Sequence, residues 1–281
     1  IQPFTINPTN PQVGARSIYK ASANDSTGYN WAGRYQSAFD TVVVPSKIVD
    51  KGNGNYFIDF GEDGFGYLTL RLNGNFLGQS MTVKFSEHAS GSSVIDAGGT
   101  TTFTSRSVAL QNGDVTYDIR TPDVSGGAIN VNPWSGGVVT PFRYVELVGC
   151  PGTVTTKDAR HHVLHVPFDD GSSAFTSSDS TLNAVWDLCK YTMKATSFAS
   201  IYVDGDRERK PYEADAYINQ LGHYGVDREF TTGRYSYEYL LDHSTWPTEW
   251  KLHFPLMAWA DYLYTGDMEG LAANYASLVS Q

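Results

Sequence analysis

The segment from Asp204 to Asp215 reads DGDRERKPYEAD and contains five carboxylates and three basic side chains within twelve residues. So many ionisable groups cannot all lie in a core, and catalytic groups concentrate in loops that a rigid scaffold holds in place. A solvated charged turn is the alternative interpretation. Tyr212 lies within this segment, and Trp246 and Trp250 follow it in the sequence. Because carboxylates and guanidinium groups bind sugar hydroxyls and aromatic faces pack on sugar rings, the mixture favours a carbohydrate ligand.

Glycoside hydrolysis needs one carboxylic acid to protonate the leaving oxygen and a second carboxylate to attack or to activate water. The charged segment offers several candidates for the acid. Other chemistries lack their motifs, since the sequence has no G-x-S-x-G elbow, no H-E-x-x-H pair and no phosphate-binding loop. His161 and His162 are neighbours on a predicted strand, so their side chains point to opposite faces and do not easily share one metal ion. We therefore expect no metal and no cofactor.

The composition narrows the class of partner. The 281 residues carry 30 acidic and 20 basic side chains, a formal net charge of −10. A nucleic acid or an anionic membrane would need a basic face, so neither is expected as a partner. No apolar run is long enough to span a bilayer. The compartment cannot be read from the sequence, and a secreted or periplasmic location is favoured. Cys150 and Cys189 are both interpreted as buried thiols.

The sequence changes character near residues 167–180. Before this point, short alternations of apolar and polar residues separated by Asn-Gly turns predict antiparallel strands and a β-sandwich. After it, apolar residues recur at helical spacing and the chain is predicted to be helical. Pro255 lies inside one predicted helix, 248–264, and should kink or split it. We therefore expect a sandwich domain over residues 1–170 and a helical domain over 171–281. The strands are expected at 41–44, 55–60, 66–72, 80–85, 116–120, 142–147 and 162–166, and the later helices at 212–224, 228–242, 248–264 and 268–279.

Several segments together resemble the α-L-rhamnosidases of glycoside hydrolase family 78. The charged segment is similar to the family's signature loop, and Phe142–Gly149 looks like the strand that ends its sandwich domain. Tyr56–Gly61 resembles an earlier strand, and Ser178–Trp186 resembles the entry to its (α/α)6 barrel. Tyr264–Asp267 is similar to a helix end that follows the loop. The resemblance implies a sandwich followed by an α-helical barrel, and a rhamnose-containing carbohydrate as substrate.

The resemblance also implies roles for individual residues. Glu208 matches the general acid. Glu213 replaces a residue that is often uncharged in the family, and it is the second choice for the acid. Asp204 and Arg207 match polar groups that hold rhamnose hydroxyls. The spacing from Asp204 to Glu208 differs from many members, so Asp204 and Asp206 could exchange parts. The other implied substrate-binding residues are Asp215, which closes the motif, and the apolar walls Tyr212, Trp246 and Trp250.

An (α/α)6 barrel has twelve helices, and only about five of ordinary length fit after Ser180. The family's general base, a glutamate from a later barrel loop, has no counterpart in these residues. The sequence is therefore expected to represent the front part of an inverting rhamnosidase, with the missing C-terminal part of the same protein as a partner. Two alternatives remain: a glycosidase of another sugar specificity on the same fold, and a carbohydrate-binding fragment without catalysis.

Overall fold

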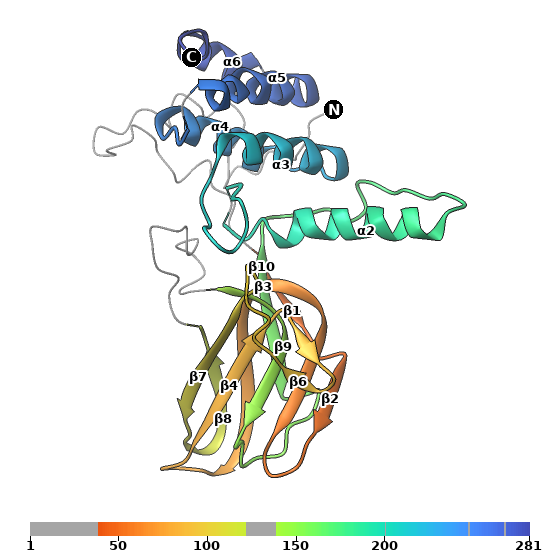
Figure 1. Cartoon of the computed structure of the whole chain (residues 1–281), viewed down its shortest axis with the longest axis vertical. Helices are drawn as coiled ribbons and strands as arrows, with labels where there is room; N and C mark the ends of the chain where they lie inside the picture. The colour runs from red at the N-terminus through yellow and green to blue at the C-terminus, as the bar shows by residue number, and fades with distance from the viewer. Residues whose placement is uncertain (1–38, 122–138, 200, 247, 267) are drawn as a thin grey trace. The chain divides into compact units, whose positions relative to one another are not determined.

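The computed structural model describes residues 39–121, 139–199, 201–246, 248–266 and 268–281 (Figure 1). The first 38 residues of the predicted sandwich domain lie outside the described residues. The chain divides into two compact units. The sheet unit comprises the described residues of 38–165 together with 205–209. The helical unit comprises the described residues of 166–204 and 210–281.

The sheet unit is built on one long strand. β3 runs from Tyr56 to Asn75 and pairs with four other strands, all antiparallel. The eight-stranded sheet has the order β1-β10-β3-β9-β4-β7, with β2 and β8 also paired to β3. The bounds are β1 Phe39–Val43, β2 Lys47–Asp50, β4 Ser80–Ser86, β7 Phe103–Ala109, β8 Asn112–Ile119, β9 Thr140–Val148 and β10 Ala159–His165, with a separate two-stranded sheet of β5 Ala89–Ser90 and β6 Ser93–Val94.

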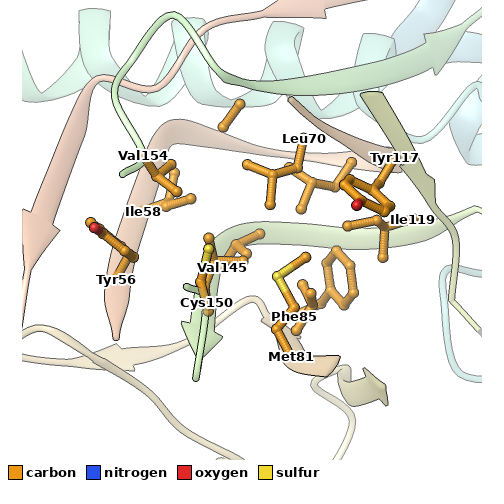
Figure 2. Packing of buried hydrophobic residues seen from close by; sticks show 14 of the residues in the cluster. Tyr56, Ile58, Leu70, Met81, Phe85, Tyr117, Ile119, Val145, Cys150 and Val154 are labelled. Carbon is orange, nitrogen blue, oxygen red and sulfur yellow. The ribbon is translucent and has the colours of Figure 1, made fainter. Parts of the chain in front are cut away.

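The core of this unit follows the period of two in its strands. On β3 the alternate residues Ile58, Phe60, Leu68 and Leu70 are all buried. Figure 2 shows Leu70 and Tyr117 pointing toward the space that Met81 and Phe85 of β4 enter from the other side. Side chains from β3, β4 and β8 thus meet in one hydrophobic cluster, which forms a core of the sheet unit. The predicted sandwich-like packing followed by a helical region is confirmed.

The helical unit has five α-helices in the described residues: α2 Ser180–Ala195, α3 Glu213–Val226, α4 Thr231–Asp242, α5 His253–Thr265 and α6 Met268–Val279. Asp179 caps α2, because its carboxylate accepts the backbone N–H groups of Thr181 and Leu182. The segment predicted as one helix over 248–264 is split, with a 3₁₀ turn at Thr248–Leu252 before α5. Pro255 then falls in the first turn of α5, where its missing N–H costs nothing.

Two further properties of the helices bear on function. In the part of the chain that the structure describes, no helix combines the length and the apolar character needed to cross a membrane. α2 has no buried residue, and Cys189 on it is exposed, so the prediction that both thiols are buried was wrong for Cys189 and right for Cys150. Leu182 and Val185, whose helical spacing with Cys189 suggested burial, are exposed as well, whereas Trp186 of the same helix stacks on the Phe175 ring with 5.4 Å between the ring centres.

Candidate active site

The tip of the charged loop, Gly205–Arg209, belongs to the sheet unit. Its last residue, Arg209, is completely buried. The Arg209 guanidinium donates to the Val139 carbonyl through Nη1 at 2.8 Å and to Asp206 Oδ1 through Nε at 2.7 Å. It also lies 5.4 Å from the centre of the Phe65 ring. Arg209 therefore anchors the loop tip to the sheet unit.

Both carboxylate oxygens of Asp206 have protein partners. Oδ1 accepts from Arg209, and Oδ2 accepts from the Thr102 hydroxyl. Asp206 was predicted as a group that binds sugar hydroxyls. That role stays a prediction, and the contacts of Asp206 in the structure hold the loop in place.

Two carboxylates that the sequence did not single out lie beside this anchor. Asp63 is next to Glu87 and Asp206, and burial, followed by the Glu87 charge and a hydrogen bond to it, raises the pKa of Asp63 to about 8. Glu87 Oε2 accepts the backbone N–H of Thr102 at 2.5 Å. An ionised Asp63 beside the carboxylates of Glu87 and Asp206 would add negative charge to a partly buried site, and a proton on Asp63 relieves the repulsion. No motif marks Asp63, because it reaches the site through a shift in strand register between Asp59 and Gly64.

Arg207 and Glu208 are the more accessible residues of the loop tip. Arg207 Nη2 lies 2.7 Å from Glu208 Oε1, and the two side chains are 63% and 32% exposed. A carboxyl that is about one-third exposed beside a cation can contact a ligand while the cation holds its orientation. A cavity of about 330 Å³ opens at the loop tip in the sheet unit, with Asp206 and Arg207 among its lining residues. Its other lining residues are Gly99, Thr100, Thr101, Thr102, Phe103, Thr104, Thr121 and Thr140.

The other predicted site residues belong to the helical unit. Asp204 closes the base of the loop, since its backbone N–H donates to the Lys210 carbonyl at 3.0 Å and its Oδ1 accepts the Lys210 N–H at 2.9 Å. Glu213, the second choice for the acid, is completely buried in the first turn of α3. Its carboxylate accepts the Thr245 N–H at 2.7 Å and the Thr245 hydroxyl at 2.5 Å. Glu213 thus fixes the segment that leads to Trp246.

The predicted aromatic walls come together in the helical unit. The ring centres of Tyr212 and Trp250 are 6.3 Å apart, and those of Trp246 and Trp250 are 6.0 Å apart. Trp246 is 52% exposed, which leaves a face available to a ligand. Asp215, partly buried, lies in the first turn of α3, where the helix dipole favours a negative charge.

Among the described residues, no group of three or more histidine, cysteine, aspartate or glutamate side chains could hold a metal ion. The two neighbouring histidines of β10 have different surroundings, as their strand positions require. His161 is buried against the Phe142 ring, whereas His162 Nδ1 lies 2.9 Å from Asp40. Burial holds the pKa of His161 down to about 3.

Comparison with known proteins links the helical unit to one family. Residues 170–280 match the family model described as the bacterial alpha-L-rhamnosidase six-hairpin glycosidase domain. No curated protein matches the sequence.

Solved structures extend the likeness to most of the chain. The α-L-rhamnosidase from Dictyoglumus thermophilum has a TM-score of 0.70 at 19% identity, covering 86% of this chain and 28% of that one. The Streptomyces avermitilis α-L-rhamnosidase, solved with L-rhamnose, has a TM-score of 0.66 at 17% identity, with 87% and 24% covered. A rhamnosidase from Klebsiella oxytoca with rhamnose bound has a TM-score of 0.60 at 12% identity, with 88% and 56% covered. The chain thus spans about a quarter of the length of the first two of these.

The described residues accordingly place a sheet-rich region before a helical region, as those rhamnosidase structures do. The resemblance to the α-L-rhamnosidases of glycoside hydrolase family 78 is confirmed, by the family model for residues 170–280 and by the shared fold for most of the chain.

Proposed function

We propose that this chain carries the acid side of the active site of an inverting α-L-rhamnosidase. Glu208 protonates the glycosidic oxygen of the leaving group. A second carboxylate, from outside these 281 residues, activates water on the opposite face of the sugar. An inverting pair of carboxyl groups is separated by roughly 6.5–9.5 Å, which leaves room for the water molecule.

The observation that carries this assignment is that the carboxylates of the charged segment differ in their contacts and exposure. Asp206 is engaged by Arg209 and Thr102, and Glu213 is buried against Thr245. Glu208 remains accessible, with 32% of its side chain exposed beside Arg207. A general acid must come within hydrogen-bond reach of the leaving oxygen, so accessibility favours Glu208.

Arg207 and Asp204 are proposed to bind rhamnose hydroxyls, with Asp215 as a further polar contact. Trp246, Trp250 and Tyr212 supply apolar surface for the ring and its methyl group. The printed title of the Streptomyces avermitilis structure names L-rhamnose as its ligand, which supports this choice of sugar.

The test uses the full-length protein and an aryl α-L-rhamnoside, with the first-formed sugar followed by NMR. The proposal predicts hydrolysis with release of β-L-rhamnose, which then mutarotates. Release of α-L-rhamnose would contradict inversion. Faster hydrolysis of another aryl glycoside would favour a different sugar specificity, and binding of rhamnose without hydrolysis would favour a non-catalytic role.

A further inference from the structure

The residues on either side of the Arg207–Glu208 pair are tied to each other. Asp206 and Arg209 form an ion pair three residues apart, and the arginine side chain is completely buried. Arg209 also donates to the backbone carbonyl of Val139 at 2.8 Å. Asp206 and Arg209 therefore hold the loop tip on both sides, with only Arg207 and Glu208 between them.

Thr102 links Asp206 to a further segment of the sheet unit. Its hydroxyl donates to Asp206 Oδ2, and its backbone N–H donates to Glu87 Oε2 at 2.5 Å. Glu87 in turn shares a hydrogen bond with Asp63. The direction of the Asp206 carboxylate is thus set by neighbours from two separate segments of the sheet unit.

The backbone at Arg209 has a φ of 49°, a left-handed conformation that is rare for a residue with a long side chain. Such a conformation costs about 1–2 kcal/mol, and a buried ion pair adds little net stability against its desolvation. Strain and buried charge that persist together cluster at functional sites, where the surrounding contacts fix a geometry. The arrangement is therefore better explained by what it positions than by what it stabilises.

We propose that Asp206, Arg209 and Thr102 are positioning residues that fix the direction of the Glu208 carboxyl toward the leaving oxygen. This inference rests on the proposed function, in which Glu208 is the general acid. Misplacing a catalytic group by about 1 Å can cost roughly 100-fold in rate. Loss of the contacts among Asp206, Arg209 and Thr102 should therefore slow the reactions that depend on protonation of the leaving group and leave the rates of the others nearly unchanged.

The experiment compares two substrates in the full-length enzyme: methyl α-L-rhamnoside, whose leaving group needs a proton, and 4-nitrophenyl α-L-rhamnoside, whose leaving group needs little help. Arg209→Lys and Thr102→Val should lower kcat/KM on the methyl rhamnoside at least tenfold more than on the nitrophenyl rhamnoside. Thr102→Ser keeps the hydroxyl and should restore wild-type behaviour on both. Glu208→Gln supplies the reference pattern of selectivity.

The matched control is Arg71→Lys. Arg71 also forms a two-bond pair with an aspartate of the sheet unit, Asp114, at 2.7 and 2.5 Å, but this pair is exposed. Arg71→Lys should leave kcat/KM unchanged on both rhamnosides. Thr102→Val is close to isosteric, so its folded state can be verified by thermal unfolding even where Arg209→Lys fails to fold.

The positioning role would be overturned if Glu208→Gln is selective but a folded Thr102→Val enzyme loses kcat/KM equally on both substrates. It would also be overturned if that enzyme loses none. Equal losses in Glu208→Gln itself would instead overturn the assignment of Glu208 as the acid, and the positioning role with it. The two failures are therefore distinguishable.

Discussion

At the scale of a single residue, the raised pKa of Asp63 predicts how the free energy of unfolding depends on pH. Its pKa in the folded protein is about 8, raised from the usual aspartate value by burial and by the neighbouring carboxylates of Glu87 and Asp206. Between the unfolded and folded pKa values the folded state binds the extra proton. The free energy of unfolding should therefore fall as pH rises, by up to about 1.4 kcal/mol per pH unit.

Asp63→Asn keeps a hydrogen-bond donor toward Glu87 and an acceptor for the Gly64 N–H, which Asp63 Oδ1 accepts at 2.9 Å. The variant should lose this pH dependence. Denaturant unfolding between about pH 6.5 and 8 measures it as a difference in slope between the two proteins, because the titration of His161 in the unfolded state, near pH 6.5, contributes equally to both. An unchanged slope in the variant would show that Asp63 does not hold the proton.

Arg207 and Asp204 carry a prediction about binding. Arg207 is exposed at the loop tip, and removing a charged partner from a sugar hydroxyl loses roughly 1.5–3 kcal/mol. We expect Arg207→Ala and Asp204→Ala in the full-length enzyme to raise the inhibition constant of L-rhamnose by about tenfold or more. Asp204→Ala should also lower stability, because it opens the base of the loop. Unchanged inhibition constants in both variants would remove these residues from the binding site.

The sequence predicted the loop and several of its members, but not the partners that arrange it. Glu208 could be proposed as the acid because it lies in a motif of contiguous residues. Arg209 carries no role in the sequence-based prediction, since nothing local indicates that its side chain is buried or that it reaches the Val139 carbonyl. Thr102 and Glu87 lie more than a hundred residues from the loop, so only the tertiary structure brings them together.

At the scale of elements, β3 shows why strand bounds were partly missed. Two strands were expected, 55–60 and 66–72, with the polar and glycine residues 61–64 left outside both. The structure continues one strand through this segment with a shift in register. β7 was not predicted because most of its residues are exposed and it lies at the edge of the sheet, so it lacks an apolar alternation. A kink or split of the helix at Pro255 was predicted, since proline acts locally, and the structure has the break just before it, between Leu252 and His253.

Gly66 tests the close approach of β3 and β10. A Cβ at this position would lie 1.9 Å from the His162 carbonyl oxygen and 2.7 Å from His161 Nε2. Gly66→Ala should therefore force the strands apart and lower the free energy of unfolding by about 3 kcal/mol. Gly78→Ala is the control, because a Cβ there meets nothing within 4 Å and only the left-handed φ of 85° opposes it, at about 1 kcal/mol. Equal costs at both positions would show that the strands do not pack as closely as the structure has them.

At the scale of the whole molecule, the helical unit exposes an apolar stripe on and just before α5. Leu252, Leu256, Trp259 and Leu263 recur at helical spacing and are 57%, 45%, 50% and 60% exposed. Exposed apolar patches of this kind drive association. We expect the purified 281-residue chain to associate and to lack rhamnosidase activity, because in the proposed mechanism the second carboxylate lies outside this chain.

Light scattering after size exclusion measures the association. Leu256→Lys with Leu263→Lys should reduce it, whereas Leu77→Lys, at an exposed leucine of the sheet unit, should not. A monomeric chain at high concentration would contradict the prediction for the stripe. Turnover by the isolated chain would mean that one of its own carboxylates, such as Glu213 or Glu249, acts as the base.

The most direct test of the central claim compares Glu208→Gln with Glu213→Gln in the full-length enzyme, on methyl and 4-nitrophenyl α-L-rhamnosides. General acid catalysis contributes about 10²–10⁴-fold, and a leaving group of low pKa needs little of it. Glu208→Gln should abolish turnover of the methyl rhamnoside and spare the nitrophenyl rhamnoside. Glu213→Gln, whose amide can still accept the Thr245 N–H, should affect both substrates alike and weakly. Selective loss in Glu213→Gln, or equal loss on both substrates in Glu208→Gln, would contradict the account.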